Sequence, residues 1–297
     1  MRLDFPNGAV LAVEGPARLT VVSSWEVRLD RGRLNAWCPE SAHGFTVRTA
    51  HAAATDLGTS FGVSAGDGGQ ADFVVLDGSV EVANRRETIR LEEGSALSSD
   101  DSGALRSVDF NPSGFKRTWP LALGILSTKG ALAPAEPDTP ERLAALEHDA
   151  CVLVIPERRG IPFDRPIRAD FIAPGTMPGD FDGMGYDLPP VGGKRLNAYQ
   201  LRYNPVGSFP EEKFLRFEGE VTFDRPVVAI QCQNEYLVGG DEMFATGPWS
   251  GELRGIELTQ IRNPPDSVTL SADRRTVRVV FYTGRYTDAV RVIVEAN

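Results

Sequence analysis

Residues 1–99 are divided into short apolar-alternating segments by turn-forming residues. The turns contain Gly, Asn or Asp, which tolerate the backbone angles of tight turns. They are Asn7-Gly8, Glu14-Gly15-Pro16, Asp30-Arg31-Gly32, Gly66-Asp67-Gly68-Gly69, Asp77-Gly78 and Glu93-Gly94. Short alternating segments at this spacing are typical of an all-β meander, roll or sandwich.

The clearest expected hairpin joins residues 71–76 to residues 79–83 through the Asp77-Gly78 pair. This pair accepts the positive φ angles of a type I′ turn, which matches the twist of paired strands. On the second strand, Val80 and Val82 are expected to face the core, with polar residues between them on the solvent side.

A chain of 297 residues is long enough for two domains, since a domain typically takes about 150 residues. Its 41% hydrophobic and 24% charged residues are ordinary for a folded protein. We expect a first β domain over residues 1–99, a linker over 100–149 and a second domain over 150–297. Prolines in the linker disfavour helix, except for one short helix from Thr139-Pro140 to about His148.

The second half returns to alternating β segments, which favour a two-sheet, jelly-roll-like sandwich. The expected strands are 151–155, 168–172, 198–203, 214–223, 227–231, 267–270, 276–281 and 289–295. Two long loops, 173–196 and 233–257, separate some of these strands, and long loops on a β scaffold commonly carry binding sites.

Charge and cysteine content exclude some classes of function. The net charge of −10 disfavours nucleic acid and anionic lipid surfaces as partners. The three cysteines lack C-x-x-C spacing and cannot form a disulfide framework. Cys151 and Cys232 could form one bridge in an exported protein, but the pattern favours two buried thiols.

The N-terminal residues MRLDFPNGAVLAVEG enter a strand-and-turn pattern without the basic and apolar regions of a signal peptide. The apolar run at 121–126 is far shorter than the ~20 residues of a membrane span. We therefore expect no direct membrane span, and either a soluble protein or an export segment absent from this sequence.

Four motifs in order resemble the FecR family, over residues 3–97. They are VRLDRGRLNAWCPESAHGFTVRT, ATDLGTSFGV, ADFVVLDGSVEV and IRLEEGSAL. Such domains are non-catalytic β modules of bacterial envelopes. Within the motifs, Gly58 and Gly78 occupy turns, and Asp56 and Thr59 can hydrogen-bond local amides. Residues beyond Arg168 resemble, less closely, a sandwich module of secreted planctomycete-like proteins, which implies export and surface display.

The FecR resemblance implies where in the cell the chain is located. Signalling members of the family have a cytoplasmic helical segment that contacts a sigma factor, one membrane span and then the periplasmic β domain. This sequence begins inside the β domain. Periplasmic, extracellular or cell-surface location is therefore expected.

The sequence offers few parts for catalysis. His43, His51 and His148 show no metal-binding spacing, and nucleophile-elbow and phosphate-loop motifs are missing. We therefore expect no enzyme and no organic cofactor.

One candidate metal site is the glycine-bent segment DFDGMGYD, in which Asp180, Asp182 and Asp187 could hold calcium. The alternative is an ordinary acidic turn, which the lack of a bidentate glutamate favours. Four loop aromatics, Tyr236, Phe244, Trp249 and Tyr286, could form a sugar-stacking or protein-docking surface, although core packing is the commoner role.

The leading functional hypothesis is a structural or interaction protein that self-associates on the cell surface or into a filament, because strand edges and long loops support such contacts. Its partner would be another copy or another envelope protein. The alternatives are the periplasmic sensor portion of a FecR-type anti-sigma regulator and a carbohydrate-binding surface module.

Overall fold

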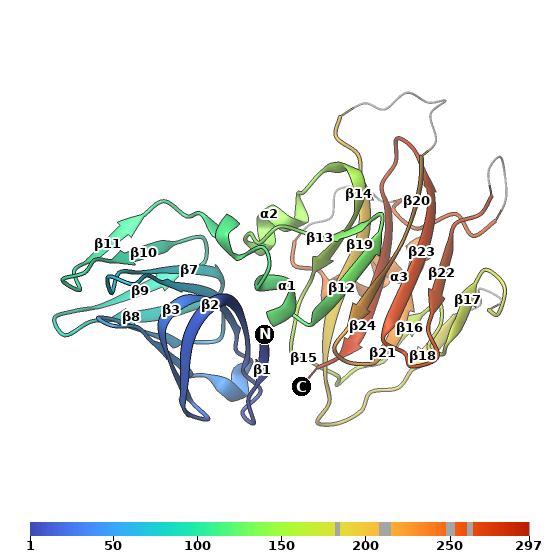
Figure 1. The fold of residues 1–297 in the computed structure, drawn as a ribbon. Coiled ribbons are helices and arrows are strands. Elements are labelled where there is room, and N and C mark those ends of the chain that lie inside the picture. Colours follow the sequence, from blue (N-terminus) through green and yellow to red (C-terminus); the bar gives the residue numbers. More distant parts are fainter. Residues whose placement is uncertain (182–184, 208–214, 248–252, 260–263, 297) are drawn as a thin grey trace. The chain divides into compact units, whose positions relative to one another are not determined.

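The computed structural model describes residues 1–181, 185–207, 215–247, 253–259 and 264–296. The chain is nearly all β, as expected, and divides into two compact units (Figure 1). The first unit comprises Met1–Leu123 with Glu136–Pro140, and the second comprises Gly124–Ala135 with Glu141–Asn297. Residues 100–149, expected as a linker, are divided between the two units.

The first unit is built from eleven strands in one hydrogen-bonded sheet. Their bounds are β1 Arg2–Asp4, β2 Val10–Ser23, β3 Glu26–Trp37, β4 Thr46–Arg48, β5 Ala53–Asp56, β6 Ser60–Ala65, β7 Ala71–Asp77, β8 Ser79–Ala83, β9 Thr88–Glu92, β10 Ala96–Ser99 and β11 Leu105–Val108. The short helix α1, Trp119–Ala122, also lies in this unit.

Strand β3 lies at the branch point of this sheet. It pairs along most of its length with β2, while its opposite edge pairs with β4 at the N-terminal end and with β6 at the C-terminal end. The order β11-β10-β7-β6-β3-β4-β5-β8-β9 therefore has two branches. Apolar side chains from both branches, among them Phe45, Phe61, Phe73 and Val82, form one buried core.

The prediction of a hairpin at Asp77-Gly78 is wrong, because the two strands that this turn joins do not pair with each other. Strand β7 pairs with β6 and β10, whereas β8 pairs with β5 and β9, so the chain crosses between the two branches at this turn. Gly78 does adopt a positive φ of 80°. A glycine turn specifies the local backbone but not the strand that will pair next, which explains the error. Val80 and Val82 are buried, as expected.

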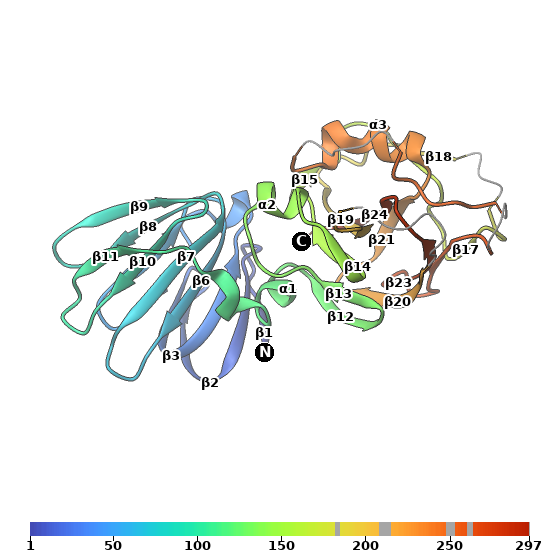
Figure 2. The same ribbon diagram turned by 90° about the horizontal axis from the view of Figure 1, so that it is seen from above.

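The second unit contains two larger sheets that pack face to face and one small sheet (Figure 2). One has the order β12-β20-β23-β22-β17, and the other has β13-β14-β19-β24-β21 with β15 on β19. The strands are β12 Ile125–Gly130, β13 Leu132–Pro134, β14 His148–Pro156, β15 Ile161–Pro162, β16 Ile167–Ala169, β17 Gly175–Met177, β18 Tyr186–Leu188, β19 Arg195–Asn204, β20 Leu215–Phe223, β21 Val227–Gln231, β22 Ser267–Leu270, β23 Thr276–Thr283 and β24 Asp288–Glu295.

The core of the second unit lies between these two sheets. Tyr199 and Val292 from one sheet and Phe223 and Val279 from the other belong to the same buried cluster. The alternation of Val290, Val292 and Val294 in the sequence thus marks the inward face of β24, because successive side chains of a strand point to opposite faces.

The chain has more helix than the sequence pattern suggested. Helix α2, Pro140–Ala144, begins where expected but ends before His148, where β14 begins. Helix α3, Asn234–Phe244, lies where a long loop was expected. No helix in the described residues is long and apolar enough to span a membrane. Cys38, Cys151 and Cys232 are free thiols.

Candidate functional site

Helix α3 packs on the outer face of the sheet that contains β19, β24 and β21. Its apolar residues Tyr236, Leu237, Gly240, Met243 and Phe244 follow the three- and four-residue spacing of one helix face, and all are buried. Met243 and Phe244 belong to a small core with residues of the three strands. This packing places the opposite face of α3 at the protein surface.

Asp170 holds the N-terminal end of α3. Its carboxylate accepts hydrogen bonds from the backbone amides of Cys232 and Gln233, at 2.5 and 3.0 Å, and from the Gln233 side chain at 2.6 Å. These amides belong to the two residues that precede α3, so Asp170 fixes the path of the chain into the helix. A carboxylate is also favourable near this end because the helix dipole is positive there.

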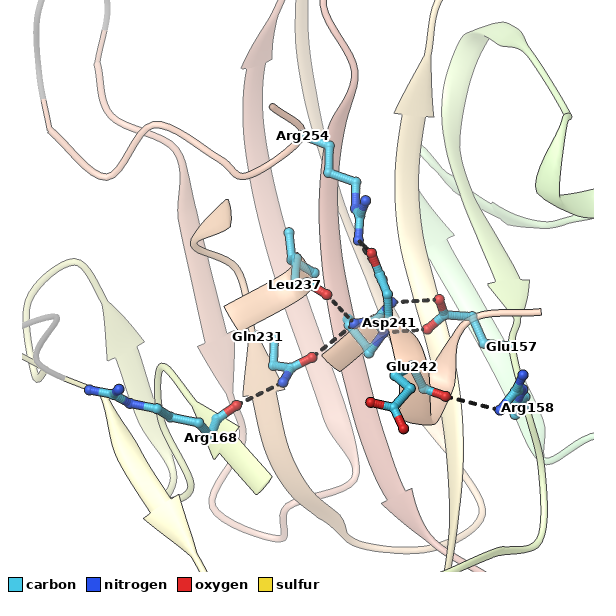
Figure 3. A network of polar contacts seen from close by, with 9 residues as sticks. Glu157, Arg158, Arg168, Gln231, Leu237, Asp241, Glu242 and Arg254 are labelled. Atoms are coloured by element: carbon cyan, nitrogen blue, oxygen red, sulfur yellow. Dashed lines mark hydrogen bonds and ion pairs between the residues drawn. The ribbon is translucent and has the colours of Figure 1, made fainter. Parts of the chain in front are cut away.

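A buried ion-pair network lies beneath the middle of α3. Arg291 of β24 is fully buried, and its guanidinium donates to both carboxylate oxygens of Glu157 at 2.6 and 2.9 Å. It also donates to Asp241 of α3 at 2.7 Å and to Gln231 at 3.0 Å. The Leu237 carbonyl accepts the remaining bond at 2.8 Å, and Figure 3 shows these partners converging. Arg291 therefore links α3 to the sheet with every N–H used.

Arg254 extends the network from the segment that follows α3. Its guanidinium donates to both carboxylate oxygens of Asp241, at 2.5 and 2.6 Å, and the residue is 3% exposed (Figure 3). Two buried arginines thus share Asp241. Both contacts of Arg254 come from one nitrogen, Nη2, and Arg291 adds a third contact to the same carboxylate. Charge-assisted hydrogen bonds of this kind are strong, so they hold α3 to the sheet at Asp241.

A groove of about 350 Å³ lies between α3 and the residues at the start of β16. We call it the α3 groove. Its lining is Arg165, Pro166, Ile167, Arg168, Gln231, Glu235, Tyr236, Gly239, Gly240, Glu242, Met243 and Phe244. The volume lies in the range of small-ligand sites in proteins.

The lining of the α3 groove mixes apolar and polar side chains, and its rim is charged. At the rim, Arg165 pairs with Glu242 at 2.9 Å, and Arg168 lies 3.8 Å from Glu235. These four side chains are largely solvent-exposed, so their pairs are weak and open to exchange with ligand groups. At the floor, the Gln231 side chain donates to the Arg168 carbonyl at 2.7 Å (Figure 3). The lining suits a polar ligand or peptide segment.

Two neighbouring glycines of α3 shape this groove differently. A methyl group at Gly239 would meet no atom within 4 Å, whereas one at Gly240 would lie 2.6 Å from the Gln231 Oε1 and 2.8 Å from an Arg291 nitrogen. Gly240 is thus required by the buried network, while Gly239 leaves the groove open.

We expect Gly239→Ala and Gly240→Ala to change stability in opposite directions. Alanine in a helix is favoured over glycine by about 0.5–1 kcal/mol, so Gly239→Ala should stabilise the second unit. Gly240→Ala should destabilise it by about 1–3 kcal/mol, because the methyl group overpacks a buried site. Urea unfolding followed by circular dichroism measures both, and equal shifts would contradict this packing.

The first unit contains the D-L-G-T corner expected from the sequence. Asp56 is fully buried, and its carboxylate accepts hydrogen bonds from the Thr59 hydroxyl and from the Gly58 amide, the latter at 2.9 Å. Gly58 has a φ of 104°. A methyl group at Gly78 would lie 2.5 Å from the Gly58 carbonyl oxygen, so the two turns touch at their backbones.

Burial raises the pKa of Asp56 to about 6, although the Thr59 and Gly58 hydrogen bonds and the nearby His43 act in the opposite direction. Because the pKa of Asp56 is raised in the folded chain, this carboxyl group ionises more easily in the unfolded chain than in the folded one. Its stabilising contribution is complete below pH 4 and is lost as the pH rises through about 6.

We therefore expect Asp56→Asn to remove part of the pH dependence of the first unit. Asparagine lacks the ionisation, so the free energy of unfolding of the wild type minus that of the variant should fall between about pH 4 and 7. Urea unfolding at a series of pH values measures this difference. A difference that stays constant with pH would contradict the role of Asp56.

Two of the three residues expected to bind calcium, Asp180 and Asp187, each contact another residue in the structure. Asp180 accepts a hydrogen bond from the Thr176 amide at 2.7 Å, and the exposed Asp187 lies 3.9 Å from Arg168. Asp182 lies outside the described residues. These contacts describe a turn carboxylate and a surface ion pair, and calcium binding there stays a prediction.

The loop aromatics have separate surroundings. Tyr236 and Phe244 belong to the buried face of α3, while Tyr286 is 63% exposed. Trp249 lies outside the described residues. Core packing therefore accounts for two of the four.

The sequence analysis missed Arg291, Glu157 and Asp241. The available signal was the helical spacing of apolar residues from Tyr236 to Phe244. Two consecutive glycines within that segment weaken a helix prediction, because glycine is a poor helix former. Once α3 is absent from the prediction, nothing covers Arg291, and its alternation with valines indicates solvent exposure.

Comparison with known families gives a match within the first unit. The first unit is a largely antiparallel β scaffold with a buried D-L-G-T corner, and the family model described as FecR protein matches its residues 1–81. Residues 1–81 form a FecR domain, which confirms the resemblance seen in the motifs. The match does not extend into the second unit, whose likeness to a secreted sandwich module stays a prediction. No curated protein matches the chain.

Two crystal structures of a proposed anti-sigma factor from Parabacteroides distasonis are similar to part of the chain. Both are 20% identical to it, and the alignments cover 44% of this chain and 62% and 64% of theirs. The chain thus spans less than two thirds of the length of these structures. The TM-scores are 0.34 and 0.35, so the family match is the stronger of the two findings.

Proposed function

We propose that this chain is the extracytoplasmic sensor portion of a FecR-type regulator, which acts by binding and not by catalysis. The match of residues 1–81 to the FecR family carries this proposal. The family match supports this function better than the self-associating assembly that the strand edges suggested.

In this proposal the two units have different roles. The FecR domain contacts the signalling machinery of the envelope, and the second unit receives the signal at the α3 groove. The groove supports this division because its rim charges are exposed, and because Arg291 holds two of its lining elements by hydrogen bonds to Asp241 of α3 and to the lining residue Gln231. A site with a fixed floor loses little conformational entropy when a ligand binds.

Transcript profiling tests the regulatory function. We would delete in frame the codons for residues 1–297 from the chromosome and sequence the transcripts of the deletion and wild-type strains. The expected result is a strong change in one set of genes whose promoters share a recognition element, restored by the wild-type gene. A strain with unchanged transcripts would contradict the proposal.

A labelling experiment tests the location. Ser24 is exposed at the turn between β2 and β3, so Ser24→Cys offers a reactive thiol at the surface. Cys38 and Cys232 are buried and the half-buried Cys151 sets the background, which the wild type measures. A membrane-impermeant maleimide should label the variant in cells with a permeabilised outer membrane. Labelling only after the inner membrane is lysed would contradict an extracytoplasmic location.

A further inference from the structure

Three carboxylates from separate segments converge at one end of the second unit. One oxygen each from Glu257, Asp266 and Asp288 lies within 4.8 Å of the others. Asp266 precedes β22, Asp288 begins β24, and Glu257 lies between α3 and β22. Asp266 and Asp288 are 1% and 3% exposed, while Glu257 is exposed to solvent. We call these residues the acidic cluster.

Backbone hydrogen bonds hold the acidic cluster in place. Asp266 accepts from the Tyr282 amide at 2.6 Å and from the Glu257 amide at 2.9 Å. The Asp266 amide in turn donates to the Glu257 carbonyl at 2.8 Å. The two segments are therefore joined in a fixed register, and the carboxylate of Asp266 has a defined direction.

No basic side chain of the described residues forms an ion pair with this cluster. By contrast, the carboxylates of Glu157 and Asp241, on the outer face of the sheet, are paired with Arg291 of β24, the strand that also carries Asp288. Burial raises the pKa of Asp266 to about 7 against its backbone hydrogen bonds, and nearby Glu257 adds to the rise. Burial, with the charges of Asp266 and Glu257, also raises the pKa of Asp288. Buried carboxylates of this kind take up a proton or bind a cation.

A buried hydroxyl without a partner points to a ligand at the same place. Tyr203 is fully buried, and its phenol oxygen has no hydrogen-bond partner in the described residues. Tyr203 lies directly opposite Asp288 in the pairing of β19 with β24, so both side chains leave the same face of the sheet. The pKa of this phenol is raised by burial and then by the charges of Asp149 and Asp288. Buried polar groups usually have partners, so this oxygen indicates an unfilled interaction.

We propose that Glu257, Asp266 and Asp288 bind a calcium ion, with Tyr203 hydrogen-bonded to its bound water. Calcium takes six to eight oxygen ligands and tolerates irregular geometry, which suits three carboxylates from three segments and an open side for water. The ion neutralises the cluster and joins the beginnings of β22 and β24 to the Glu257 segment. This site shares no residue with the α3 groove and is separate from the Asp180–Asp187 segment.

Calcium titration of the full chain tests the site. The protein would first be stripped with a chelator, and calcium binding would be measured by isothermal titration at pH 8 with magnesium as the comparison. We expect one calcium ion to bind, with a dissociation constant near the 10⁻⁴–10⁻³ M range, about that of extracellular calcium modules. We also expect the melting temperature to rise with calcium concentration, because the ion binds the folded state. No heat and no shift in melting temperature would overturn the proposal.

Three variants locate the ion. Asp288→Asn should abolish the calcium response and, in chelator at pH 8, should be no less stable than the wild type, because it removes a buried like charge. Glu257→Gln changes an exposed residue, so it should fold normally and bind calcium at least tenfold more weakly, a difference of about 1.4 kcal/mol. Asp187→Asn should respond as the wild type does. A response lost in Asp187→Asn but kept in Glu257→Gln and Asp288→Asn would overturn the proposal.

Discussion

Replacing Arg291 with alanine is expected to destabilise the second unit by about 3–5 kcal/mol, because the change leaves buried carboxylates without their counterion. Glu157 is fully buried and has both oxygens paired with Arg291. Asp241 would keep Arg254 but lose its bond to β24. Scanning calorimetry should show a lower melting temperature for the second unit, while the melting of the FecR domain stays unchanged.

Arg165→Ala is the matched control for this variant. Arg165 also pairs with a carboxylate of α3, but its side chain is 45% exposed and that of Glu242 is 84% exposed. Exposed pairs contribute about 0–1 kcal/mol, so the control should change stability little. Similar losses in the two variants would show that burial of the Arg291 network does not govern the stability of the α3 site.

The second large effect is expected at Gly78. The substitution Gly78→Ala should destabilise the FecR domain by more than about 2 kcal/mol. Two costs add at this position. Gly78 has a φ of 80°, a region that costs an alanine about 1–2 kcal/mol. Its new methyl group would also meet the Gly58 carbonyl oxygen at 2.5 Å, and both backbones would have to move. Urea unfolding of the FecR domain measures the loss.

Gly44→Ala separates the two costs. Gly44 has a similar φ of 92°, but a methyl group there would meet no atom within 4 Å. This variant should lose only the conformational term of about 1–2 kcal/mol. If the two alanine variants lose the same stability, the close contact between the Gly58 and Gly78 turns contributes nothing.

Strand positions were the most predictable feature of the fold. The alternation of Val290, Val292 and Val294 reports directly on which face of β24 is buried, because the side chains of a strand alternate. Pairing was less predictable. The Asp77-Gly78 turn satisfies the local rule for a hairpin, yet the chain crosses to another branch of the sheet, since the burial of both branches decides which strands pair.

The sites were the least predictable feature because they are assembled from distant segments. The acidic cluster unites residues 257, 266 and 288, and the Arg291 network unites residues 157, 241 and 291. The sequence pattern drew attention to Asp180 and Asp187, which are close in sequence. In the structure, Asp180 accepts a hydrogen bond from the Thr176 amide and Asp187 lies 3.9 Å from Arg168. Local spacing carries no signal for contacts that only the tertiary fold creates.

The most direct measurement of the central claim is the transcript profile of a strain whose chromosomal gene carries Gly78→Ala. If the FecR domain belongs to a regulator of transcription, disrupting its corner should change the same genes as the in-frame deletion, while the Gly44→Ala strain should remain close to wild type. Wild-type transcripts in both the Gly78→Ala strain and the deletion strain would contradict the regulatory function.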